Sequence, residues 1–133
     1  MSLQYALPGH NHVPEYQASG VPWVSSSHAI VNTTAVEFVF PYVSRHFTIF
    51  NSGTTEVRVG FTQNGVDSNP NANYFLVLAN SQSPRFEIKT DKVFIRKESG
   101  TDPSTVSIVA GLTGVDRGRF FEVTGSKGVT GVG

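Results

Sequence analysis

The sequence contains no cysteine among its 133 residues. Disulfide bonds, thiolate nucleophiles and cysteine-based zinc sites are therefore excluded. A chain without cysteine also fits a protein made in a reducing compartment.

A net charge is absent as well, because ten lysines and arginines balance ten aspartates and glutamates. Proteins that bind nucleic acid usually carry an excess of positive charge against the phosphates, so direct contact with nucleic acid is not expected. Basic residues do outnumber acidic ones between Arg85 and Lys97. That local excess is most simply the solvated outer face of strands.

Long apolar runs are missing too: none approaches the roughly 18–20 residues that a membrane-spanning helix needs. The first ten residues, MSLQYALPGH, have neither the basic start nor the apolar stretch of a secretory signal. Domains commonly contain about 100–150 residues. The sequence therefore predicts a single soluble domain without a transmembrane segment.

Metal ligands are few and poorly spaced. His10 and His12 could face the same side of an extended segment, with Glu15 close by. A structural zinc site needs four ligands, however, and the only other histidines are His28 and His46. We therefore expect no metal site.

Calcium, glycan and catalytic motifs fail in a similar way. Residues 67–73 begin like a calcium loop, but an EF-hand requires glycine and glutamate where this sequence has Ala72 and Leu78. Asn32 opens a formal glycosylation sequon, which should stay unused without a secretory signal. No spacing marks a catalytic triad, and residues 111–118 match no phosphate loop. We expect no enzymatic activity and no cofactor.

The sequence is rich in short β-type stretches separated by Gly, Pro, Asn or Asp. In most of them inward and outward residues alternate, and residues 74–79 form a continuous apolar stretch. These stretches are residues 36–40, 43–50, 56–62, 74–79, 85–89, 92–96, 106–112 and 119–123. Eight or nine short strands at spacings of about 8–12 residues indicate a sandwich or barrel, and this chain length suits a jelly roll. We predict an all-β fold, a single eight-stranded jelly-roll sandwich without a convincing helix.

The two ends of the chain differ from this pattern. Residues 1–21 contain Pro8, Gly9, Pro14 and Gly20 and predict an extended N-terminal arm with no helix of any length. The arm is apolar enough to become ordered, either against its own domain or against a neighbour. Residues 22–124 would form the sandwich. Residues 125–133 would form a Gly-rich tail that is mobile unless a partner holds it.

Several strands carry apolar residues on both faces, whereas a strand with one face in a core should be polar on the other. Val39, Phe50 and Phe94 should point away from the core, on the opposite face of the strand from their core-facing neighbours. Loops and the arm would cover these side chains, or they form a subunit interface, since large exposed apolar patches usually mark contacts. Both interpretations can hold at once.

Several segments carry a resemblance to a known family: FPYVSRHFTIFNSG (40–53), VRVGFTQNGV (57–66), NYFLVL (73–78), VFIRKESG (93–100), VSIVAGLTGV (106–115) and the terminal TGSKGVTGVG. From Pro22 onward the sequence resembles small single-jelly-roll capsid proteins of large icosahedral double-stranded DNA viruses. The resemblance implies a structural protein of the virion shell, made in the host cytoplasm.

In such viruses the major capsid protein has two jelly rolls, and a shorter single-jelly-roll protein closes the fivefold vertices as the penton. Other small proteins cement the shell from inside. The resemblance favours the penton, as a homo-pentamer that contacts major and minor capsid proteins. A minor or cement capsid protein is the alternative within the family.

Five copies related by rotation would meet through heterologous contacts, in which one patch meets a different patch on the next copy. The candidate interface residues fall into three groups. Val39, Phe50 and Phe94 lie on the outer faces of predicted strands, and Arg45 and Arg58 would make polar contacts at the rim. The arm supplies Tyr5, Leu7, Tyr16 and Trp23.

Two other classes of protein remain open. The first is a ligand-binding sandwich, lectin-like or receptor-binding, in which Trp23, Tyr74 and the 63–73 loop would form the site. The second is an enzyme on a cupin-like jelly roll, which needs a histidine cluster that the four histidines are poorly placed to form.

Overall fold

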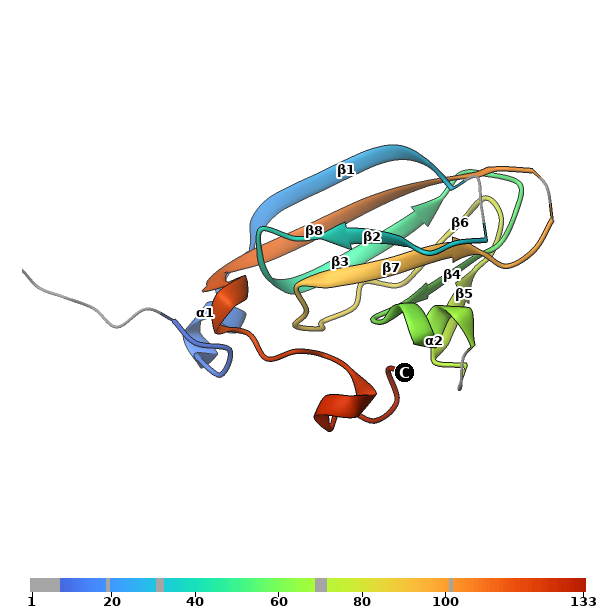
Figure 1. The fold of residues 1–133 in the computed structure, drawn as a ribbon. Coiled ribbons are helices and arrows are strands. Elements are labelled where there is room, and N and C mark those ends of the chain that lie inside the picture. The colour runs from blue at the N-terminus through green and yellow to red at the C-terminus, as the bar shows by residue number, and fades with distance from the viewer. Residues whose placement is uncertain (1–7, 19, 31–32, 69–71, 101) are drawn as a thin grey trace, which may run out of the picture.

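Eight strands form two four-stranded antiparallel sheets that enclose one hydrophobic core (Figure 1). The computed structural model describes residues 8–18, 20–30, 33–68, 72–100 and 102–133. The predicted all-β sandwich with eight strands is confirmed.

Sheet A has the strand order β1-β8-β3-β6, with β1 at Val21–Ile30, β8 at Ser104–Asp116, β3 at Tyr42–Asn51 and β6 at Ser81–Gln82. Sheet B has the order β2-β7-β4-β5, with β2 at Val36–Val39, β7 at Lys92–Lys97, β4 at Val57–Gly60 and β5 at Tyr74–Val77. Except for the neighbours β4 and β5, each strand is followed in the sequence by a strand of the other sheet.

The core forms where the inward rows of the two sheets meet. Phe47 and Ile49 of β3 are fully buried, whereas Thr48 and Phe50 between and after them are only half-buried. The Phe47 ring lies within 6.4 Å, centroid to centroid, of the rings of Phe40, Phe61 and Phe86. The alternation in the sequence therefore gives the inward row of this strand correctly.

Two predicted strands are wrong. Residues 85–89 contribute only a single bridge, from Phe86 to Phe47, and residues 119–123 contain no strand. The 3₁₀ helix η1 (Arg117–Arg119) follows β8 directly and turns the chain out of sheet A. Residues beyond η1 leave the sheet and run towards α2, so they pair with no edge strand.

The prediction that no helix forms is also wrong, because two helices of one turn are present. Helix α1 covers Val13–Gln17, and Pro14 sits in its first turn, where the missing N–H is not needed. Helix α2 covers Gln63–Asp67. The Thr62 side chain accepts a hydrogen bond from the Gly65 N–H at its start, and Ser68 in the left-handed conformation ends it.

The described part of the N-terminal arm lies against its own domain. The Gly114 N–H donates to the Glu15 carboxylate at 2.8 Å, and Arg45 Nε donates to the Tyr16 carbonyl at 2.8 Å. Tyr5 and Leu7 lie outside the described residues. None of the helices in the described ranges is long and apolar enough to cross a bilayer.

The C-terminal tail folds back onto its own chain as well. In Figure 1 this red segment runs from the end of β8 along the sandwich towards α2. The Thr62 hydroxyl donates to the Val132 carbonyl, and the Gly125 N–H donates to the Gly133 carbonyl at 2.9 Å, within the tail. The tail is therefore held by contacts with the start of α2 in the same chain.

Candidate functional site

The outer face of sheet A carries almost no charge. Arg45 and Asp116 are the only Asp, Glu, Lys or Arg residues in its four strands, all of which the structure describes. Both lie towards the end next to α1, where Asp116 pairs with Tyr42 and Arg45 bonds to Tyr16. The rest of this surface is called the neutral face and contains Pro22, Val24, Thr48, Phe50, Ser107 and Val109.

Val24 and Val109 form the centre of the neutral face. They are direct cross-strand partners in β1 and β8, and Thr48 of β3 completes the row. Val24 is 59% exposed and Val109 is 39% exposed. Phe50 and Ser107 pair two residues further along, so an apolar and hydroxyl surface extends over three strands.

His46 lies at one end of the neutral face, beside Gly111. A side chain on Gly111 would collide with the imidazole ring, so the absence of a Cβ there lets the ring lie across β8. Burial lowers the pKa of His46 below its ordinary 6.5, and Arg85 and Arg45 lower that pKa further, against the opposing effect of Glu87. The neutral form of the ring is therefore favoured, which keeps this end of the face uncharged.

This lowered pKa predicts a pH dependence of stability. Because the unfolded chain binds the proton more readily, the contribution of neutral His46 is complete above pH 6.5 and is lost as the pH falls towards the lower folded pKa. Urea unfolding from about pH 7.5 to 5.5 should show less loss of stability in His46→Gln than in the unchanged chain. His12→Gln, at an exposed position, is the control. The same slope in His46→Gln would contradict the assignment.

The outer face of sheet B is charged and is covered in part by its own chain. Arg58 of β4 donates to both carboxylate oxygens of Glu98, at 2.6 and 3.2 Å, and its Nη1 donates to the Val66 carbonyl at 2.9 Å and to Ser68 Oγ at 3.2 Å. Its guanidinium lies 4.5 Å from the centre of the Tyr74 ring. Arg58 thus ties β4 to α2, β5 and the end of β7.

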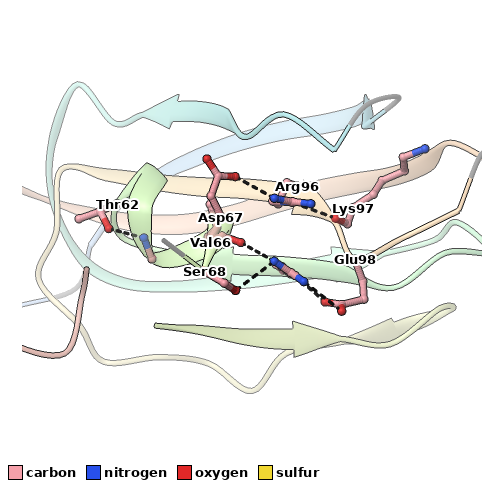
Figure 2. A network of polar contacts seen from close by, with 9 residues as sticks. Thr62, Val66, Asp67, Ser68, Arg96, Lys97 and Glu98 are labelled. Carbon is pink, nitrogen blue, oxygen red and sulfur yellow. Dashed lines mark hydrogen bonds and ion pairs between the residues drawn. The ribbon is translucent and has the colours of Figure 1, made fainter. Parts of the chain in front are cut away.

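A second ion pair holds α2 in the same way. Arg96 of β7 donates to Asp67 at 2.9 Å, and its side chain is only 15% exposed (Figure 2). Figure 2 shows Val66 and Asp67 of α2, and Ser68 directly after it, facing Arg96 and Glu98 across this network. Hydrogen bonding to Arg58 lowers the pKa of the Glu98 carboxyl and raises that of the arginine.

Glycine at position 60 lets α2 lie directly on sheet B. A Cβ on Gly60 would come within 2.7 Å of the Val66 side chain, which is fully buried. Beside α2, a half-open cavity of about 590 Å³ lies between the start of β7 and the C-terminal tail. Phe94, Lys92, Asn64 and Asn73 are among its lining residues.

The structure separates most of the predicted interface residues. Val39 on β2 is 39% exposed, and Phe50 lies on the neutral face. Phe94 has the expected outward parity but is buried, with 9% exposure, where it lines the cavity. Trp23 belongs to β1 rather than to the arm, and its half-buried ring packs edge-on to Phe40 at 4.9 Å.

The remaining predicted residues make contacts within the chain. Tyr16 and Arg45 join α1 to β3, and Arg58 is the centre of the network on sheet B rather than a free polar rim. The sequence reasoning missed Val24 and Val109. The signal that could have found them is the lack of any Asp, Glu, Lys or Arg at residues 21–30 and 104–115.

Trp23 and Tyr74, proposed for one ligand site, lie on strands of different sheets. Within the described ranges no three His, Asp or Glu side chains gather in a group that could hold a metal ion.

The chain matches no model of a known protein family, and a search of curated proteins finds no relative.

Proposed function

We propose that the chain is a structural virion protein that forms the fivefold vertex, or penton, of an icosahedral capsid. It would assemble with copies of itself in the shell, contact major and minor capsid proteins, and be made in the host cytoplasm. The role requires neither catalysis nor a cofactor. The resemblance of residues 40–53 and 106–115 to single-jelly-roll capsid proteins motivates this proposal.

The strand order supports a jelly-roll topology as part of this proposal. A jelly roll has eight strands in two sheets, built from two interlocked Greek keys. The orders β1-β8-β3-β6 and β2-β7-β4-β5 place the first and last strands side by side in one sheet and the second and seventh side by side in the other. Nested pairing of this kind is what two Greek keys would give.

The observation that carries the proposed assembly is the neutral face. An antiparallel sheet that faces water is normally polar on that side, and charged residues are depleted at the centres of protein interfaces. Sheet B shows the contrast, because its shorter strands carry Glu37, Arg58, Lys92 and Arg96 on that side. The neutral face of sheet A therefore has the composition of a contact surface.

The apolar side chains of the neutral face supply part of the energy that a permanent contact needs. Complete burial of a Val or Phe side chain contributes about 1.5–3 kcal/mol, and Val24, Val109 and Phe50 lie together on this face. Association costs several kcal/mol in lost translational and rotational freedom, so partner surface of similar character is needed as well.

A ring also needs a second, different patch on the same molecule. Leu76 of the edge strand β5 is 43% exposed, and Leu78 just beyond it is 54% exposed. In the proposed ring the neutral face of one copy packs against this leucine edge of the next.

Native mass spectrometry over a concentration range tests the assembly. The unchanged chain should give a pentamer, and Val24→Glu or Val109→Glu should dissociate it, because each variant buries an unpaired charge in the contact. Val13→Glu is the matched control: Val13 is 58% exposed, as Val24 is 59% exposed, but it lies on α1 away from the neutral face.

A strict monomer at every concentration would contradict the self-closing ring. The minor or cement capsid role, or a ligand-binding sandwich, would then account for the chain better. A pentamer that survives both Val24→Glu and Val109→Glu would instead place the contact on another surface.

A further inference from the structure

The half-open cavity beside α2 has a lining that the proposed assembly does not use. Its floor is the outer side of β7, where Phe94 and Lys92 lie on the same face of the strand. The start of α2 forms one wall and the C-terminal tail the other. The volume of about 590 Å³ falls in the range of about 300–1,000 Å³ that is usual for small-molecule sites.

Three carboxamide side chains line this cavity: Gln63, Asn64 and Asn73. Within the part of the chain that the structure describes, none of the three makes a side-chain hydrogen bond. Each carboxamide carries one acceptor oxygen and two N–H donors. Paired donors and acceptors of this kind match the vicinal hydroxyl groups of a sugar, which both donate and accept.

The apolar part of the lining consists of two aromatic residues and Val123. Phe61 is half-buried and Phe94 largely buried, and the Lys92 ammonium lies 5.9 Å from the centre of the Phe94 ring. Among the lining residues Lys92 is the only charged side chain. An aromatic surface beside neutral hydrogen-bonding groups fits a ligand with one apolar and one hydroxylated face.

We propose that this cavity binds a neutral saccharide, with one pyranose ring over the Phe61 and Phe94 side and its hydroxyls bonded to Asn64, Asn73 and Gln63. An extended peptide fits less well, because β7 pairs with both β2 and β4 and offers no free backbone edge for strand addition. The site shares the 63–73 loop with the one expected from the sequence, but neither Trp23 nor Tyr74 lines the cavity.

Saturation-transfer difference NMR on the full chain tests the proposal with three probes: methyl α-mannopyranoside, methyl β-galactopyranoside and methyl N-acetyl-β-glucosaminide. At least one should receive saturation from the protein and should shift the side-chain amide signals of Asn64 and Asn73. Asn64→Ala should weaken binding about threefold to tenfold, as expected for one lost hydrogen bond. Gln17→Ala is the control, because Gln17 is an exposed carboxamide on α1 outside the cavity.

The proposal is overturned if none of the three glycosides receives saturation at tens of millimolar, or if Asn64→Ala and Asn73→Ala both bind as tightly as the unchanged chain. The circular dichroism spectrum of each variant shows whether it is folded. Sugar binding can be measured on the Val24→Glu variant too, because the cavity and the neutral face lie on different sheets. The result is therefore independent of whether the chain forms a pentamer.

Discussion

Replacing Phe47 with alanine is expected to lower the free energy of unfolding by about 3–5 kcal/mol, the usual cost of removing a buried aromatic side chain. Phe47 is fully buried and contacts the rings of Phe40, Phe61 and Phe86. Its backbone also forms the bridge to Phe86 that closes the end of the core. Because total stability is typically only about 5–15 kcal/mol, this single change removes a large share of it.

The same strand supplies the matched control. Phe50 is half-buried on the outer face of β3, so Phe50→Ala should cost the folded monomer no more than about 1–2 kcal/mol. Urea denaturation at pH 7 and low protein concentration measures both losses without a contribution from assembly. Equal losses in the two variants would mean that the inward row of β3 is assigned to the wrong face.

Local alternation was enough to predict most strands. The pattern over 92–96 predicts a strand with Val93 and Ile95 on its inner face, and β7 covers Lys92–Lys97. Residues 43–50 likewise lie within β3. The alternation of a strand depends only on neighbours along the chain and on which face is buried. For this reason it can be read without knowing the partner strands.

The helix α2 could not be predicted from the same pattern. Residues 63–67 contain a central Gly65, which reads as a turn, and the helix is stabilised by the Thr62 cap and by burial of Val66 on Gly60. Tertiary contacts, rather than helix propensity, therefore decide its conformation. The wrong strand at 119–123 has a related cause, since η1 turns the chain out of sheet A and the tail then contacts the start of α2, which is distant in the sequence.

The candidate surfaces were half predictable. The alternation along each strand placed Phe50 and Phe94 on outer faces. It cannot show that α2 and the C-terminal tail, which are distant in the sequence, lie beside Phe94. The contrast in charge between the two sheets was present in the sequence. It became a surface only when the strand order placed β1, β8 and β3 side by side.

Arg58 shows why a single residue's role depends on distant partners. The sequence suggested a polar rim, whereas the structure pairs the guanidinium with Glu98, forty residues further on, and with the α2 backbone. Arg58→Met is expected to lower the free energy of unfolding by about 2–3 kcal/mol at pH 7, because it removes charge-assisted hydrogen bonds. The value lies below the cost of breaking a fully buried pair, since the Glu98 side chain is 29% exposed and water can replace part of the loss.

Arg85→Met is the control for this change. Arg85 also pairs with a glutamate, Glu87, but the two side chains are 60% and 51% exposed. Exposed ion pairs contribute little, so Arg85→Met should change stability by less than about 0.5 kcal/mol. If Arg85→Met and Arg58→Met cost the same, the burial of the Arg58 network contributes nothing.

Lowering the pH distinguishes the stability that Arg58 gains from its ion pair with Glu98 from the stability that it gains from packing. The lowered pKa of Glu98 means that its contribution is present above the ordinary value of 4.5 and is lost as the pH falls through the lower folded pKa. The stability difference between the unchanged chain and Arg58→Met should therefore shrink as urea unfolding is repeated from pH 7 to about pH 3.

The double variant Arg58→Met/Glu98→Leu should lose less stability than the sum of the two single changes, because each single change leaves the other group unpaired. A difference that stays constant down to pH 3 would assign the role of Arg58 to its contact with Tyr74 and to packing under α2, not to its pairing with Glu98.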